Sequence, residues 1–320
     1  MNGTARQYRG AEDVALLRSL LVSMRAAAGH ACWHCGDLTW RFFLHSIGHE
    51  LEQTVRLWLD GRGQVEAFGI VTPRSRAGNL LFDVQVHPHS RRPALLEQVL
   101  GWIESVAAGT VPAPRLLCTD TGVYDVDGEQ VAALRAHGFR PTGDEGLLLV
   151  RSLEAPIAVP PLPAGFRLRP VAGPREGFAR AQAHRDAFHP SRVTDEAYLR
   201  LMATPGYAAA WDLVAEAPDG SVAAFCIVWP DTANRTGEFE PVGTRPAYRR
   251  LGLARALLLE GLRRLAEAGA AGAIVGPIDT SDGAALELYR SAGFEPAYHL
   301  GTYAREWGEA QARRPGHRGF

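Results

Sequence analysis

The chain has 320 residues, of which 46% are hydrophobic and 22% are charged, a composition typical of a globular protein long enough for two domains. Its formal net charge of −1 at pH 7 gives no overall attraction to nucleic acids or anionic membranes, so neither is expected as a partner. All 34 basic residues are arginine, which excludes a Schiff-base lysine and a P-loop lysine. No signal-peptide pattern opens the sequence and no apolar run approaches about 18 residues, so the expected location is cytoplasmic.

The first half of the sequence alternates helical and strand-like patterns. An apolar period near 3.6 residues predicts helices, and shorter apolar or alternating runs predict strands. In chain order we expect a helix over residues 13–27, strands over 55–59, 65–71 and 80–86, a helix over 94–108, a strand over 115–119, a helix over 130–137 and a strand over 147–152.

A Cys-x-x-Cys pair, Cys32 and Cys35, follows the first predicted helix. Zinc needs a second pair of ligands, and none with suitable spacing lies nearby, although His30, His45 and His49 are close in sequence. We therefore expect no metal, and a metal or redox site at these cysteines is the alternative interpretation.

A proline-rich segment, residues 154–164, divides the chain almost in half and is typical of a linker, because proline interrupts helices and central strands. The second half again alternates the two patterns, with a Pro-Asp-Gly hairpin turn between two of its strands. We expect a strand over 166–170, helices near 176–188 and 195–202, strands over 211–216, 222–229 and 238–244, a helix over 252–268, a strand over 273–276, a helix over 283–292 and a strand over 298–305.

The two halves carry the same order of elements, and landmark residues recur at an offset of about 155–158 positions, which indicates duplicated domains. The pair Arg91-Arg92 recurs as Arg249-Arg250, but the residues that follow differ. The first copy has Pro93, Ala94 and Leu96 where the second has Leu251, Gly252 and Ala254. We therefore predict a degenerate domain over 1–153, the linker, a catalytic domain over 165–307 and a polar tail over 308–320.

The loop over residues 249–254 lies between a predicted strand and a predicted helix. A glycine at such a turn, followed by the unpaired N–H groups of a helix N-terminus, forms an anion site. Gly252 has no Cβ to keep a ligand from the backbone. In the first copy, Pro93 removes an N–H donor and larger side chains close the approach, so only the second copy is expected to hold a phosphate.

The second half resembles the GNAT superfamily of acyl-CoA-dependent N-acetyltransferases. Three features carry the resemblance: the Arg-x-x-Gly-x-Ala loop that starts at Arg249, the preceding strand over 238–244, and the sequence Leu-Tyr-x-x-x-Gly-Phe that ends at Phe294. The first half resembles a degenerate copy, as in tandem GNAT proteins with one silent half. The implied fold class is α/β (α+β), with two tandem GNAT-like domains, each a mixed and mainly antiparallel sheet flanked by helices.

Two carboxylates, Glu238 and Glu240, are candidates for a general base. They are two residues apart on one strand, so both side chains face the same side of the sheet. An amine arrives as an ammonium ion and must lose a proton before it attacks a thioester, and two close carboxylates raise each other's proton affinity. The sequence leaves open which of the two is the base.

The resemblance also implies a proton donor and a set of cofactor contacts. Tyr289 is placed to protonate the departing CoA thiolate, and the first copy has Leu134 at this position. The N–H of Val242 is the expected donor to the thioester carbonyl. GNAT proteins often have asparagine where this chain has Asp282, a residue that can still cap a helix. The expected contacts with acetyl-CoA are Val242, Thr244, Arg249, Arg250, Leu251, Gly252, Leu253, Ala254 and Asp282.

The expected reaction is direct acetyl transfer from acetyl-CoA to a small-molecule primary amine. The acceptor is open between a small metabolite, an antibiotic amine and a cysteinyl sugar as in mycothiol synthase. The first half is expected to complete the acceptor cleft or to form an internal pseudo-dimer, so the chain is a monomer or a homodimer. The rival interpretation is a non-catalytic acyl-CoA sensor, which would have no use for Glu238, Glu240 or Tyr289.

Overall fold

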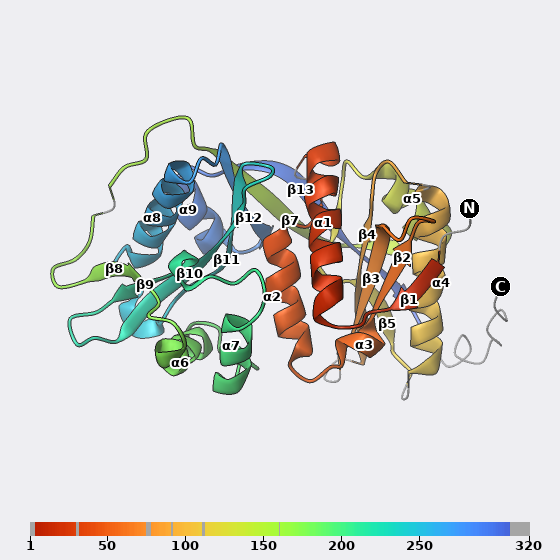
Figure 1. Cartoon of the computed structure of the whole chain (residues 1–320), viewed down its shortest axis with the longest axis horizontal. Coiled ribbons are helices and arrows are strands. Elements are labelled where there is room, and N and C mark those ends of the chain that lie inside the picture. The colour runs from red at the N-terminus through yellow and green to blue at the C-terminus, as the bar shows by residue number, and fades with distance from the viewer. Residues whose placement is uncertain are drawn as a thin grey trace. The chain divides into compact units, whose positions relative to one another are not determined.

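The computed structural model describes residues 4–29, 32–74, 78–90, 92–110, 113–159 and 161–307, without the side chains of residues 73–74. The chain forms two compact units (Figure 1), and neither is continuous in sequence. The first unit comprises the described parts of Met1–Cys32, His49–Gly146 and Tyr298–Phe320, and the second comprises Trp33–Gly48 and Leu147–Ala297.

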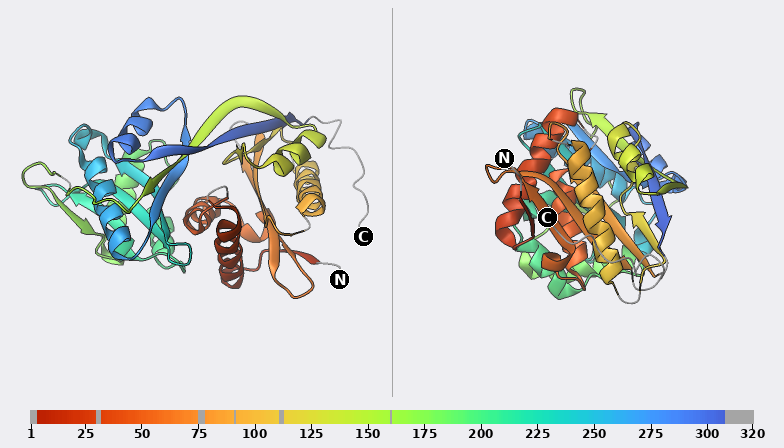
Figure 2. Two further views of the ribbon diagram at one scale, coloured as in Figure 1. Left: turned by 90° about the horizontal axis from the view of Figure 1, so that it is seen from above. Right: turned by 90° about the vertical axis from the view of Figure 1, so that its right-hand side faces the viewer.

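The first unit is a sheet covered on both faces. Helix α1 (Ala11–Ala28) contacts β3 from one face, and α4 (Arg92–Gly109) and α5 (Gly128–Ala136) pack on the other (Figure 2). The strands, in spatial order, are β1 (Thr4–Gln7), β2 (Val55–Leu59), β3 (Val65–Arg74), β4 (Asn79–Val86), β5 (Leu116–Thr119) and the end of β13 (Glu295–Glu306). The short elements α3 (Leu51–Thr54) and β6 (Val123–Tyr124) complete the unit.

The second unit is built around a central hairpin, β10 (Val222–Asp231) and β11 (Thr236–Thr244), which is rich in β-branched and aromatic residues. Strands β8 to β11 pair antiparallel, whereas β11 pairs parallel with β12. The remaining strands are β8 (Arg167–Pro170), β9 (Asp212–Glu216), β12 (Gly272–Asp279) and, next to β12, β7 (Arg140–Ser152) from Leu147 onward.

Side chains of β10 alternate between the two faces of this sheet, as the period of two residues in a strand requires. Ala224, Cys226 and Val228 pack under α8 (Leu253–Glu267), where α9 (Gly283–Ser291) completes the core. Ile227 and Trp229 face the opposite core, which contains α2 (Cys35–Ser46), α6 (Gly177–Ala187) and α7 (Asp195–Met202). Short 3-10 turns span Pro174–Glu176, Ala209–Trp211 and Pro246–Tyr248.

The predicted α/β class and the order of elements are confirmed, but the compact units do not follow the boundaries predicted at 153 and 165. Helix α2 was not predicted, and it lies in the second unit although it comes from the first half of the chain. The closing strands are also exchanged: β7 pairs next to β12, while the end of β13 pairs with β5. Residues 154–159 and 161–164 of the predicted linker form no helix or strand, and the predicted tail 308–320 lies outside the described residues.

The described part of the chain contains no helix that combines the length and the apolar character needed to cross a membrane.

Candidate active site

The two parallel strands at the centre of the second unit separate part of the way along their length. β11 pairs with β12 only over residues 236–238, opposite 272–274, although β12 continues to Asp279. Beyond Glu238 the two strands no longer form a ladder, so backbone and side chains of β11 are exposed to the space between them. Val242, the expected donor to the thioester carbonyl, lies in this part of β11, which is not paired with β12.

A β-bulge lies on β11 at the same place. Val228 pairs with Phe239 and Cys226 pairs with Val242, so Glu240 and Pro241 together stand opposite Ile227. Bulges are frequent beside active sites because they redirect a side chain. The indole N–H of Trp229 donates to the carbonyl oxygen of Glu240 at 2.6 Å, which fixes the backbone of the bulge.

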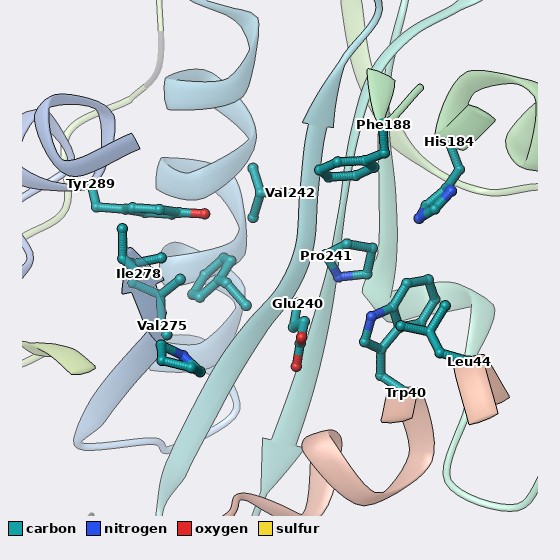
Figure 3. Close-up of a pocket in the computed structure, with 13 residues that line it drawn as sticks. Trp40, Leu44, His184, Phe188, Glu240, Pro241, Val242, Val275, Ile278 and Tyr289 are labelled. Atoms are coloured by element: carbon teal, nitrogen blue, oxygen red, sulfur yellow. The ribbon is translucent and has the colours of Figure 1, made fainter. Parts of the chain in front are cut away.

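A cavity of about 380 Å³ opens at this separation (Figure 3). Its volume lies in the range of small-molecule sites. Glu240, Pro241 and Val242 of β11 form its middle. On one side it is lined by Val275, Ile278 and Tyr289, and on the other by Trp40, Leu44, His184 and Phe188. Phe239, Gly276 and Pro277 complete the lining.

Glu240 carries the carboxylate at the centre of this cavity. Burial, followed by the negative charge and hydrogen bond of Asp37, raises the pKa of Glu240 to about 8, against the opposing charge of Arg41. Arg41 Nη2 lies 3.6 Å from Glu240 Oε1, and Arg41 Nε donates to Asp37 Oδ1 at 2.9 Å. A carboxyl group that exchanges its proton near neutral pH is suited to general-base catalysis.

Glu238 lies close to Glu240 but is placed differently. Carboxylate oxygens of Glu238, Glu240 and Asp37 lie within 4.8 Å of one another, which agrees with the predicted common face. The Glu238 side chain is only 1% exposed, does not line the cavity, and has its Oε2 3.2 Å from Nδ1 of the buried His34. A Cβ at Gly36 would lie 2.5 Å from Glu238 Oε2, so only glycine lets α2 come this close to β11. The geometry therefore distinguishes Glu240 from Glu238.

Tyr289 and Val242 lie in the cavity wall where the resemblance places a proton donor and a carbonyl contact. The Tyr289 ring packs edge-on against Phe294 at 6.1 Å, and its hydroxyl points toward Val242 (Figure 3). Burial first, and then the charge of Glu240, raises the pKa of Tyr289. The phenol is therefore protonated at neutral pH, as a proton donor must be.

The loop over residues 249–254 has the backbone geometry of an anion site. Gly252 precedes α8 with a φ of 76°, and Arg250 has a φ of 68°; such left-handed residues beside a helix start orient N–H groups outward. No side chain caps the helix at Gly252. A Cβ at Gly252 would meet no atom within 4 Å, so the positive φ is the reason for glycine at this position.

The side chains of the loop over residues 249–254 differ in their contacts and in their exposure. Arg249 donates long hydrogen bonds to the carbonyl oxygens of Thr244, at 3.4 Å, and Ala187, at 3.3 Å, which tie the loop to the end of β11 and to α6. Leu251 is 44% exposed, whereas Leu253 is buried in the core under α8. The Arg249 side chain is therefore held by the protein, while the exposed Arg250 and the backbone N–H groups face solvent at this loop.

Asp282 caps α9, as the sequence allows. Its Oδ1 accepts a hydrogen bond from the N–H of Ala285 at 2.9 Å. The side chain thus orients the helix that carries Tyr289.

The first half of the chain contributes site residues that sequence reasoning missed. Asp37, Trp40, Arg41 and Leu44 all lie on α2, which packs against β10 and β11. The available signal was a capping box: the His34 side chain accepts from Gly36 N–H, and the Asp37 side chain accepts from the N–H of His34, just before an apolar run.

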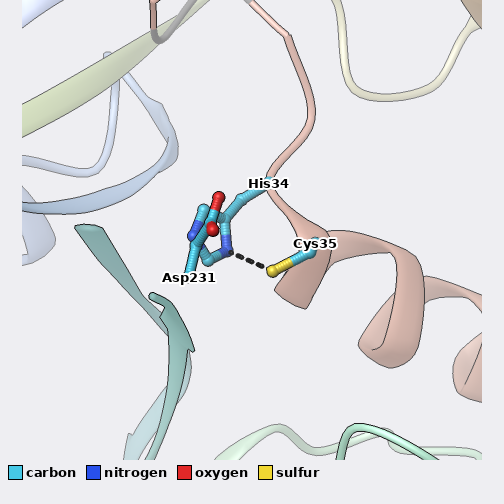
Figure 4. A group of neighbouring side chains, drawn as sticks. All are labelled: His34, Cys35 and Asp231. Atoms are coloured by element: carbon cyan, nitrogen blue, oxygen red, sulfur yellow. Dashed lines mark hydrogen bonds between the residues drawn. The ribbon is translucent and has the colours of Figure 1, made fainter. Parts of the chain in front are cut away.

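Both cysteines of the Cys-x-x-Cys pair are buried and free of disulfides. Cys35 lies with His34 and Asp231 in a buried group whose candidate ligand atoms are within 4.8 Å of one another (Figure 4). His34 Nδ1 is 3.8 Å from Cys35 Sγ, but the same nitrogen accepts the N–H of Gly36 at 3.0 Å. This nitrogen therefore also caps α2. His30 lies outside the described residues.

Comparisons with known proteins agree with this geometry. Residues 180–294 match the model of the Acetyltransferase (GNAT) family. A mycothiol acetyltransferase from Kineococcus radiotolerans is 38% identical over 146 residues, which are 44% of this chain and 46% of that protein, so the match spans just under half the length of this curated relative.

Two solved structures share the fold over almost the whole chain. A GCN5-related N-acetyltransferase from Sphaerobacter thermophilus has a TM-score of 0.62 at 21% identity, with 95% of each chain covered. A tandem GNAT protein from the clavulanic acid biosynthesis pathway has a TM-score of 0.66 at 16% identity, with 95% of this chain and 98% of that chain covered. The resemblance to the GNAT acetyltransferases is thus confirmed: residues 180–294 match the family model, and the chain shares its fold with a tandem GNAT protein over 95% of its length.

Proposed function

We propose that the second unit transfers an acetyl group from acetyl-CoA directly to a primary amine. The observation that carries the proposal is Glu240, a carboxyl group with a pKa of about 8 in the same cavity as a buried phenol, that of Tyr289. A base and an acid in one small cavity are what an amine and a thioester require when they react there.

The first step uses Glu240. Its carboxylate removes a proton from the substrate ammonium ion, directly or through water, and leaves a nucleophilic amine beside the thioester. The nitrogen then forms a bond to the acetyl carbon. The raised pKa brings the base close to the pH at which an amine exchanges its proton, so transfer is not strongly uphill.

The second step uses Val242 and Tyr289. Attack moves negative charge to the thioester oxygen, and a backbone N–H at Val242, beyond the end of the β11–β12 ladder, stabilises it. The bond between carbon and sulfur then breaks, and Tyr289 gives its proton to the departing thiolate. The nitrogen loses its second proton as the amide forms, and this proton restores the phenol of Tyr289, directly or through water. The products are an N-acetyl amine and CoA with a free thiol.

The backbone over residues 250–254 binds the pyrophosphate of acetyl-CoA. The left-handed residues Arg250 and Gly252 and the uncapped start of α8 supply N–H donors and the positive end of a helix dipole. The loop is suitably placed for acetyl-CoA, because it follows the end of β11, the strand that lines the cavity.

A cysteinyl-sugar acceptor is the second candidate, because the curated relative is a mycothiol acetyltransferase. The match to that protein covers less than half its length, so it supports the reaction class more than the acceptor. A non-catalytic acyl-CoA sensor is the third, and the pairing of Glu240 with Tyr289 argues against it.

A test combines binding with turnover. The full chain is titrated with acetyl-CoA by calorimetry and then incubated with acetyl-CoA and a panel of primary amines, while thiol release and N-acetylated products are followed. Thiol release that depends on an amine supports the proposal. Tight binding without release by any amine would favour a sensor.

A further inference from the structure

The cavity has two ends that differ in chemistry, on either side of the bulge on β11 (Figure 3). Tyr289, Val242 and Ile278 form the end that the proposed reaction gives to the thioester. Trp40, Leu44, His184 and Phe188 form the other end, which is left for the body of the acceptor. The amine nitrogen has to lie between them, beside Glu240.

The wall of the acceptor end is aromatic and aliphatic. The Trp40 and His184 rings have centroids 5.5 Å apart, and the His184 and Phe188 rings are 4.9 Å apart, so the three rings form one continuous surface. Phe188 is nevertheless 42% exposed. An exposed ring at the rim of a cavity marks a surface for an apolar ligand, because such a ring is not needed by the fold.

The charges around the acceptor end favour the binding of a cation and disfavour the binding of an anion. Among the side chains that line the cavity, Glu240 is the only carboxylate and none is an arginine. His184 is neutral, since burial and the neighbouring charges of Arg180 and Arg185 lower its pKa to about 3. Arg41, the arginine nearest to Glu240 in these contacts, is already bound by Asp37 and Glu240. A substrate carboxylate would therefore lie in this cavity without a cationic partner.

Acceptors with several hydroxyl groups also find few partners. The acceptor wall offers two polar side-chain groups, the indole N–H of Trp40 and a neutral imidazole, whose Nδ1 already faces the hydroxyl of Ser191 at 3.2 Å. Each substrate hydroxyl buried there without a hydrogen bond weakens binding by about tenfold or more.

We propose that the acceptor is a primary amine on an aromatic or aliphatic body, without a carboxylate and without several hydroxyl groups near the nitrogen. This inference rests on the proposed acetyl transfer and narrows its substrate class. Trp40 and Phe188 act as specificity-determining residues, and α2 therefore gives the first half of the chain a direct role in acceptor recognition.

The test compares three acceptors at one pH with saturating acetyl-CoA: 2-phenylethylamine, L-phenylalanine, which adds a carboxylate to the same skeleton, and D-glucosamine, which replaces the ring with hydroxyl groups. We expect kcat/KM for 2-phenylethylamine to exceed both others by about 100-fold or more. Equal or faster turnover of L-phenylalanine or D-glucosamine would overturn the inference and leave acetyl transfer intact. Turnover of none of the three, with methylamine also inert, would contradict the proposed function itself and the inference with it.

A pair of variants on one helical segment shows whether the ring surface is responsible. Phe188→Ala should lower the ratio of kcat/KM for 2-phenylethylamine to that for methylamine by about tenfold, because the contact with the ring is lost. Phe178, on α6 and 56% exposed, does not line the cavity, so Phe178→Ala should leave the ratio unchanged. An unchanged ratio in Phe188→Ala would contradict the assigned role.

Discussion

The two units contain helix starts that correspond in sequence and differ in structure. In the second unit α8 begins only after the left-handed Gly252, and no side chain caps it. In the first unit α4 begins at Arg92, so Pro93 and Ala94 already lie in the helix. The helix thus starts nearly one turn earlier in the aligned numbering, and the turn that would present N–H groups is absorbed into it.

The arginine of the first copy is also used internally. Arg92 donates to the carbonyl oxygen of Val86 at 2.9 Å and forms ion pairs with Asp127, the N-cap of α5, and with Glu129. A carboxylate from the protein thus holds the cation that a phosphate would need. The first copy therefore differs from the loop at Gly252 in both its backbone and the partners of its arginine.

The strands show the same difference. In the first unit β4 and β5 stay paired as far as Phe82 and Thr119, without a bulge between β3 and β4. Leu80 and Phe82, at the positions of Glu238 and Glu240, are buried core residues, as is Leu134 at the position of Tyr289. In the described part of the first unit, a continuous β3–β4 ladder and buried apolar side chains thus occupy the positions that line the cavity in the second unit. The same arrangement of strands and helices therefore holds a packed core in the first unit and a cavity in the second, where β11 and β12 separate after Glu238.

The largest expected effect follows from removing the base that the first copy lacks. Glu240→Gln should lower kcat by about 10²–10⁴-fold, because the amide cannot take the proton of the ammonium ion. Acetyl-CoA binding should change little. The matched variant Glu238→Gln alters a carboxylate outside the cavity and should lower kcat much less. Steady-state kinetics with one amine decides between them, and the reverse order would transfer the role of base to Glu238.

Tyr289→Phe makes the second unit more like the first by removing a hydroxyl while keeping the ring. The ring still packs against Phe294, so folding should be preserved. We expect kcat to fall by about 10²-fold, with little change in the calorimetric affinity for acetyl-CoA. A thiol-release assay measures the first quantity. Unchanged turnover would mean that the thiolate leaves without this proton donor.

The loop is tested by the same substitution in both units. Gly252→Val forces a β-branched residue into a left-handed conformation, at a cost of about 1–2 kcal/mol, so the KM for acetyl-CoA should rise roughly tenfold. Ala94→Val, at the corresponding exposed position of α4, should leave this KM unchanged. If both variants raise the KM equally, the first unit also takes part in binding the co-substrate.

Most of the fold could be predicted from the sequence, because the apolar periods of α8 and β10 and the turn at Gly220 act locally. Two features could not. Helix α2 is short and buried almost all round, including its polar residues Asp37 and His45, whereas polar residues in a sequence indicate an exposed face. The exchange of β7 and β13 depends on which sheet edge each strand meets, and the alternation of side chains is the same for either partner.

The site was predictable to the extent that it lies within contiguous motifs. Glu240, Tyr289 and the loop at Gly252 follow from residue type and spacing, and the cavity brings Glu240 and Tyr289 together. The prediction explained the raised pKa of the base by a second glutamate, whereas burial and Asp37 are its causes in the structure. Asp37 is about 200 residues away in sequence, and only the tertiary fold brings such residues together.

The smallest expected effect concerns Asp37 and Arg41, the two residues of α2 whose charges act on Glu240. Glu240 must be deprotonated to act, so kcat/KM should rise with pH through about 8. Asp37→Asn removes a charge that raises the pKa of Glu240 and keeps an oxygen for the helix cap. The rising limb of the pH profile of kcat/KM should therefore move to lower pH. Arg41→Met removes a charge that lowers the pKa, so the limb should move to higher pH. Both variants are measured with the same amine, so the ionisation of the substrate is the same in each profile. Shifts in opposite directions can then come only from the protein. Shifts in the same direction, or none, would show that α2 shapes the cavity without setting the proton affinity of the base.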